Sequence, residues 1–123
     1  SLLATAFDAA GNSKASSSVT VYVSNATTVV ADTTPPVVTI SNPVNGGKVS
    51  GNVAVKVSAT DNAGTSTLRQ TLYINGKSVA TATGGALNYS WNTRKVAAGN
   101  YTLQAVAVDA AGNSSSVQVG VTR

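Results

Sequence analysis

The sequence contains no cysteine, no histidine and no glutamate, and these absences narrow what the chain can do. Without cysteine, no disulfide can hold the fold together. Without cysteine, histidine and glutamate, the usual pairs of nucleophile and base and the usual zinc sites cannot be assembled. Serine and threonine are abundant, but no neighbouring base activates their hydroxyl groups. We therefore expect the chain not to be an enzyme.

Charged residues are also scarce, at 10% of the chain, and the four acidic ones are all aspartate. Eight lysines and arginines give a formal net charge of +4. They are scattered, with Arg94 and Lys95 as the one adjacent pair, and no stripe of aromatic residues runs between them. No apolar run approaches the roughly 20 residues that a membrane-spanning helix needs. The composition thus argues against nucleic-acid binding and against membrane insertion.

What the chain does contain is typical of an all-β protein. Short runs of valine and alanine are separated at close intervals by glycine, asparagine and serine. In NVAVKVSAT (52–60), apolar residues alternate with polar ones, which predicts a strand with one buried face. Asn75-Gly76 lies between two apolar runs and strongly indicates a hairpin turn. We expect seven strands, as in a Greek-key β-sandwich, at 37–41, 51–60, 67–74, 77–82, 86–91, 100–108 and 115–122.

The hexapeptide DAAGNS occurs twice, starting at Asp8 and at Asp109. The interval of 101 residues is close to the size of one small β-domain. The flanks match as well, because LLATAFDAAGNS aligns with LQAVAVDAAGNS and SVTVYV resembles SVQVGV. We interpret residues 1–23 as a hairpin, the last two strands (2–7 and 17–23) of a preceding repeat. Residues 24–36 are then a linker stiffened by two prolines, and 37–123 form a complete domain.

Residues 32–122 resemble the bacterial immunoglobulin-like (Ig-like) repeats, which occur in tandem in secreted hydrolases and cell-surface adhesins. The motifs that carry the resemblance are, in order, DTTPPVVTISNP, LYINGKSVA, YSWNT and GNYTLQAVAVDAAGNS. The resemblance implies an Ig-like sandwich, neighbouring repeats as partners and a secreted or cell-surface location, but no single activity. It also places Tyr101 as a tyrosine corner and Trp91 as the large core residue between the sheets.

Three of the four aspartates are expected to meet at one end of such a sandwich. Asp61 and Asp109 follow the second and sixth strands, and Asp32 precedes the first, which starts near the same end. Calcium prefers oxygen ligands of this kind, and Asn62 and Asn113 could add neutral oxygens. Ordinary turn chemistry, in which an aspartate accepts backbone N–H groups, is the competing explanation. The calcium hypothesis requires that Asp32 lie close to the other two aspartates.

Three roles remain open from the sequence. The first is a spacer or adhesive stalk unit of a long extracellular bacterial protein, with Ca²⁺ stiffening the junctions between repeats. The second is an accessory module of a secreted hydrolase that binds polysaccharide through aromatic residues, although Trp91 shares a strand face with Leu87 and Tyr89, which favours core packing. The third is self-assembly, in which the hairpin 1–23 adds its open edges to another molecule's sheet.

Overall fold

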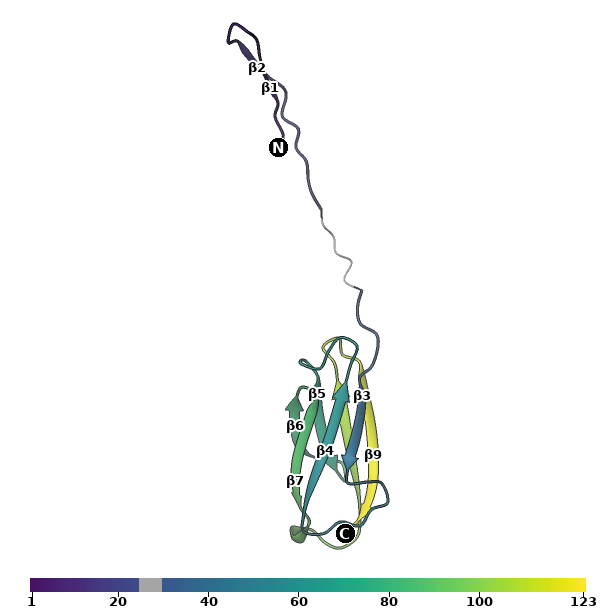
Figure 1. The fold of residues 1–123 in the computed structure, drawn as a ribbon. Coiled ribbons are helices and arrows are strands. Elements are labelled where there is room, and N and C mark those ends of the chain that lie inside the picture. Colours follow the sequence, from purple (N-terminus) through teal and green to yellow (C-terminus); the bar gives the residue numbers. More distant parts are fainter. Residues whose placement is uncertain (25–29) are drawn as a thin grey trace. The chain divides into compact units, whose positions relative to one another are not determined.

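The computed structural model describes residues 1–24 and 30–123, which form two separate units, Ser1–Val30 and Ala31–Arg123 (Figure 1). The second unit contains seven strands and one short 3₁₀ helix. Its elements are β3 (Val37–Asn42), β4 (Asn52–Thr60), β5 (Arg69–Ile74), β6 (Lys77–Thr83), β7 (Ala86–Asn92), η1 (Thr93–Lys95), β8 (Asn100–Val108) and β9 (Ser114–Thr122). All seven predicted strands are present, with bounds shifted by at most two residues.

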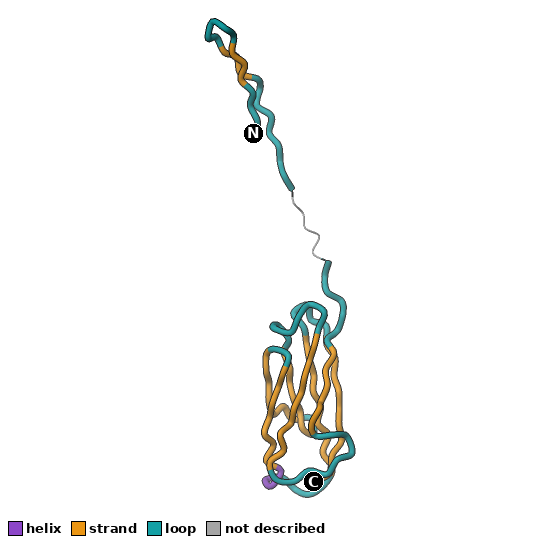
Figure 2. Tube along the Cα trace, viewed as in Figure 1, coloured by secondary structure: helices purple, strands orange, loops and turns teal. Residues whose placement is uncertain are grey.

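The seven strands form two antiparallel sheets, in the orders β3-β4-β7 and β6-β5-β8-β9. Figure 2 shows the strands in orange and the loops that join them in teal. The chain changes sheet three times, between β4 and β5, between β6 and β7 and between β7 and β8. This arrangement confirms the predicted all-β, Ig-like sandwich. Among the described residues, no helix is both long enough and apolar enough to cross a membrane.

The core lies between the two sheets and follows from the alternation of each strand. Along β4, Val55, Val57 and Ala59 are buried while Lys56 and Ser58 are exposed. Across the sandwich the central residues are at most 2% exposed; they include Val55, Leu72, Leu87 and Leu103. Burial of apolar side chains on two facing sheets therefore holds the unit together without a disulfide.

The antiparallel strands bring distant segments to the two ends of the sandwich (Figure 1). We call the end that holds residues 31–36 and the loops after β4 and β8 the entry end. The opposite end, with the β3–β4 loop, the β5–β6 turn, η1 and the end of β9, is the exit end. Side chains that are far apart in the sequence meet at each end.

The boundary of the second unit differs from the predicted one. Residues 31–36, assigned to the linker from the sequence, belong to the sandwich. Pro36 is fully buried, and its carbonyl accepts a hydrogen bond from the hydroxyl of Ser115. Pro35 and Pro36 lie directly before β3. This position tolerates them, because a residue without a backbone N–H is accepted where a strand begins. Residues 25–29 of the predicted linker lie outside the described residues.

In the first unit, β1 (Thr5–Phe7) pairs with β2 (Ser13–Ala15), and an isolated bridge joins Leu2 to Val19. The predicted strand over 17–23 is wrong, because the second strand of the hairpin is Ser13–Ala15. Alternating valines indicate a strand that buries one face against neighbours. In this unit Val19, Val21 and Val23 are all exposed, so no packing favours a strand there.

Candidate functional site

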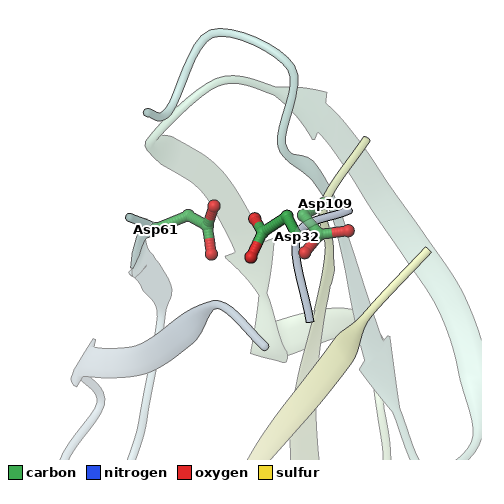
Figure 3. A group of neighbouring side chains, drawn as sticks. All are labelled: Asp32, Asp61 and Asp109. Carbon is green, nitrogen blue, oxygen red and sulfur yellow. The ribbon is translucent and has the colours of Figure 1, made fainter. Parts of the chain in front are cut away.

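Asp32, Asp61 and Asp109 come together at the entry end (Figure 3). Each offers one carboxylate oxygen, and the three oxygens lie within 4.8 Å of one another. Asp32 lies five residues before β3, Asp61 directly follows β4 and Asp109 directly follows β8. Three separate segments therefore supply the cluster, and the proximity that the calcium hypothesis requires is present.

The loop that carries Asp109 is built by its own sequence. The amide N–H and the side-chain nitrogen of Asn113 donate to the two carboxylate oxygens of Asp109, at 2.9 and 2.7 Å. Gly112 adopts a φ of 93°, a left-handed conformation that glycine accepts without strain. The same bonds recur in the first unit, where Asn12 donates to Asp8 at 2.9 and 2.8 Å. Because the motif folds identically in both places, local chemistry sets the conformation of Asp109.

Hydrogen bonds within this loop also lower the pKa of the Asp109 carboxyl group. Burial is the largest influence on the pKa of Asp109 and raises it, but the bonds from Asn113, Gly112 and Ala111 together outweigh it. The pKa of Asp109 therefore lies below its ordinary value. The carboxylate of Asp109 is consequently ionised at neutral pH and available to a cation.

Hydrogen bonds within turns provide a partner for only one carboxylate oxygen in each of the other two aspartates. One oxygen of Asp61 accepts the N–H of Ala63 at 2.9 Å, and one oxygen of Asp32 accepts the N–H of Thr34 at 3.0 Å. The second oxygen of each, Oδ1 of Asp61 and Oδ2 of Asp32, is buried and has no hydrogen-bond partner among the described residues. Burying a carboxylate oxygen without a hydrogen-bond partner costs free energy, so a ligand bound to these two oxygens would stabilise the fold.

Asn62 and Asn113 act as hydrogen-bond donors here, where the sequence suggested oxygen ligands. Asn62 donates its side-chain amide to Oδ1 of Asp32 at 3.2 Å. Asn113 donates to Asp109 and also to the backbone carbonyl of Asp32 at 3.0 Å. Both asparagines thus hold the carboxylates in position, and the carboxylate oxygens themselves are the ligand atoms on offer.

The resulting cluster is made of oxygen alone and carries three carboxyl groups. Like charges at such separations repel one another, so the arrangement is unfavourable unless a cation or protons offset the charge. Oxygen-only ligand sets of this kind suit Ca²⁺, which also accepts backbone carbonyls and water. The fourth acid, Asp8, belongs to the first unit and is fully engaged in its own turn.

Trp91 and Tyr101 lie at the exit end. Trp91 is 5% exposed, and its ring meets that of Tyr101 edge to face, with centroids 5.2 Å apart. The hydroxyl of Tyr101 donates to the carbonyl of Ala97 at 2.8 Å and so ties β8 to the segment after η1. The two rings therefore form part of the core at this end and fix the segment between β7 and β8.

Comparisons with known proteins agree with this architecture. The family model described as bacterial Ig domain matches residues 36–105. A search of curated proteins finds no match. Among solved structures, the endo-beta-1,4-mannanase from Thermotoga petrophila superposes with a TM-score of 0.58 at 12% sequence identity. The alignment covers 74% of this chain and 20% of the mannanase chain, so the chain spans about a fifth of that protein.

Proposed function

The chain belongs to the bacterial Ig domain family, and we propose that it is a non-catalytic spacer or adhesive unit of an extracellular protein whose entry end binds Ca²⁺. Bacterial Ig domains usually occur in secreted or surface proteins, and their sandwich serves as a scaffold. The duplicated DAAGNS loop supports use in tandem, with neighbouring repeats as the partners.

The observation that carries the calcium part of the proposal is the pair of unpartnered oxygens on Asp32 and Asp61. Both lie in a cluster whose third member, Asp109, is held ionised by hydrogen bonds. A divalent cation would provide a partner for both oxygens and offset the charge of all three side chains. The remaining coordination positions of Ca²⁺ would be filled by carbonyl oxygens and water.

Calcium at this place would act on the connection between repeats. Asp32 lies before β3, on the segment through which the chain enters the sandwich, whereas Asp61 and Asp109 belong to the sandwich loops. An ion shared by all three would hold the entering segment against both loops. The connection to a preceding repeat would then be shorter and stiffer with Ca²⁺ than without it, which suits a spacer in a long stalk.

Thermal unfolding of the full chain, with calcium and with excess chelator, tests this proposal. A metal bound only by the folded state raises the free energy of unfolding by about 2.7 kcal/mol at 100 times its Kd. For a domain of this size, each kcal/mol corresponds to about 4–8 °C in Tm. We expect Ca²⁺ to raise the Tm of the wild type, and Asp61→Asn to abolish the rise while keeping the side-chain shape.

Asp8→Asn is the matched control, because Asp8 lies in the same motif but outside the cluster. This variant should respond to Ca²⁺ as the wild type does. Mg²⁺ should stabilise less, since it demands a tighter octahedral geometry and gives up its water reluctantly. An equal Tm with calcium and with chelator would contradict the metal site, and the spacer role would then rest on the fold and the repetition.

The second candidate is an accessory module of a secreted hydrolase that positions a polysaccharide. The mannanase from Thermotoga petrophila contains a region of the same fold that makes up about a fifth of its chain. That likeness supports an attached, non-catalytic role and names no ligand for this chain. Measuring whether the chain binds sugars at all distinguishes this candidate from a pure spacer.

A further inference from the structure

A hollow opens at the exit end of the sandwich, between the edge strands β6 and β7. Its volume is about 420 Å³, within the usual range of small-ligand sites. Its walls are mostly apolar and aromatic, formed by Val79, Tyr89, Trp91, Val96 and Tyr101. The sequence predicts Trp91 as a core residue that shares a strand face with Tyr89, and it gives no sign that their packing leaves a depression.

The fold itself keeps this hollow open. β6 and β7 are the edge strands of different sheets and are not hydrogen-bonded to each other. Tyr101 is held by its bond to Ala97 and by its edge-to-face contact with Trp91. The aromatic wall is therefore formed before any ligand arrives, which lowers the entropic cost of binding.

The rim of the hollow offers donors and positive charge. Lys77 and Lys95 line it, and both side chains are exposed. Asn75 and Asn92 line it too, and their side-chain oxygens accept the N–H groups of Thr102 and Arg94. The amide nitrogens of both asparagines consequently remain as donors toward a ligand.

The acidic side chains of the second unit are confined to one of its ends. Its three acidic residues are all in the cluster at the entry end, so none borders the hollow. The two lysines at the rim therefore have no aspartate of this unit nearby. The hollow is electrostatically complementary to an anion.

We propose that this hollow binds an acidic sugar, a uronic-acid residue of an anionic polysaccharide. A pyranose ring has an apolar face of C–H groups, which suits the aromatic wall at Tyr89. Its hydroxyls can accept from the amides of Asn75 and Asn92, and its carboxylate can lie between Lys77 and Lys95. An aliphatic carboxylate would use the lysines but leave the amide donors without partners. The inference rests on the accessory role proposed above and is independent of the calcium site.

Trp91 is the one tryptophan of the chain and lines the hollow, so its fluorescence reports on binding. The full chain is titrated with a trisaccharide of galacturonic acid and, separately, with the neutral galactose trisaccharide, and both are repeated by calorimetry. Chelator is present throughout, because uronate carboxylates bind Ca²⁺ themselves. We expect saturable binding of the acidic trisaccharide and at least tenfold weaker binding of the neutral one.

The double variant Lys77→Gln with Lys95→Gln should weaken binding of the acidic trisaccharide about tenfold. The matched control is Lys48→Gln with Lys56→Gln, which removes the same charge outside the hollow and should bind as the wild type does. Tyr89→Leu, checked for an unchanged fold by circular dichroism, should also weaken binding. Asp61→Asn should leave sugar binding intact, since it belongs to the entry end.

Three results would overturn the proposal. The first is no response to the acidic trisaccharide at millimolar concentration by either method. The second is equal binding of the neutral trisaccharide, which would remove the role of the lysines. The third is an equal loss in the control double variant, which would show diffuse attraction without a site. None of these results bears on Asp61 or on the effect of Ca²⁺ on Tm.

Discussion

Asn113 donates its side-chain amide to the backbone carbonyl of Asp32, 81 residues earlier in the chain, at 3.0 Å. The same nitrogen donates to the carboxylate of Asp109 at 2.7 Å. One side chain thus joins the segment that enters the sandwich to the loop after β8. The cluster at the entry end depends on this link, because it places Asp32 beside a loop that local sequence has already shaped.

Replacing Asn113 with alanine should destabilise the second unit. The variant leaves the carbonyl of Asp32 and one oxygen of Asp109 without their donor, at a cost of about 1–2 kcal/mol. Asn12→Ala is the control, because Asn12 makes the same bonds to Asp8 in the first unit. Urea unfolding followed by Trp91 fluorescence measures both variants. An equal stability of Asn113→Ala and the wild type would show that the link contributes little.

Acid should weaken the second unit through Asp109. Its folded pKa is depressed below the ordinary value of 3.8, so its ionised form is favoured by folding. The stabilisation is therefore fully present above about pH 4 and is lost as the pH falls through the folded pKa. The measurement is the free energy of unfolding against pH in metal-free buffer. In Asn113→Ala this free energy should fall less steeply below pH 4 than in the wild type, because the variant lacks one of the bonds that lower the pKa of Asp109. Asp8→Asn should leave the pH dependence of the unfolding free energy of the sandwich unchanged. A less steep decrease in that variant too would show that Asp109 is not the group responsible.

Tyr101→Phe should lower the free energy of unfolding by about 1 kcal/mol. The substitution keeps the contact with Trp91 but removes the hydroxyl that donates to Ala97. Tyr22→Phe is the matched control, since Tyr22 is 89% exposed and should be neutral. Chemical denaturation of both variants measures this change in the free energy of unfolding. If the two variants proved equally stable, the bond to Ala97 would have no energetic role.

Residues 1–23 should cause the chain to associate at high concentration. Leu2 and Val21 are 67% and 55% exposed, whereas their counterparts Leu103 and Val119 are 0% and 7% exposed in the complete sandwich. Exposed apolar side chains beside open strand edges favour addition to another sheet. Sedimentation velocity over a range of concentrations should show association that Val21→Lys reduces and the control Val44→Lys, in an exposed loop of the sandwich, does not. A single monomeric species at all concentrations would argue against self-assembly.

Much of the fold could be read from the sequence because its signals are local. Alternation in β4 predicts which residues are buried, since successive side chains of a strand point to opposite faces. Asn75-Gly76 predicts the turn between β5 and β6, where both residues have positive φ. The strand expected at 17–23 was wrong because alternation indicates a strand only where neighbours cover one face.

The sequence by itself determined the conformation of the DAAGNS loops, because the bonds of Asp8 and Asp109 involve residues at most four positions away. Only the tertiary structure decided which oxygens of Asp32 and Asp61 are left without partners, since that depends on three segments meeting at one end. It also decided that the aromatic residues around Trp91 border a hollow. Turns are set by neighbours along the chain, whereas a site is set by packing between sheets, which no short stretch of sequence encodes.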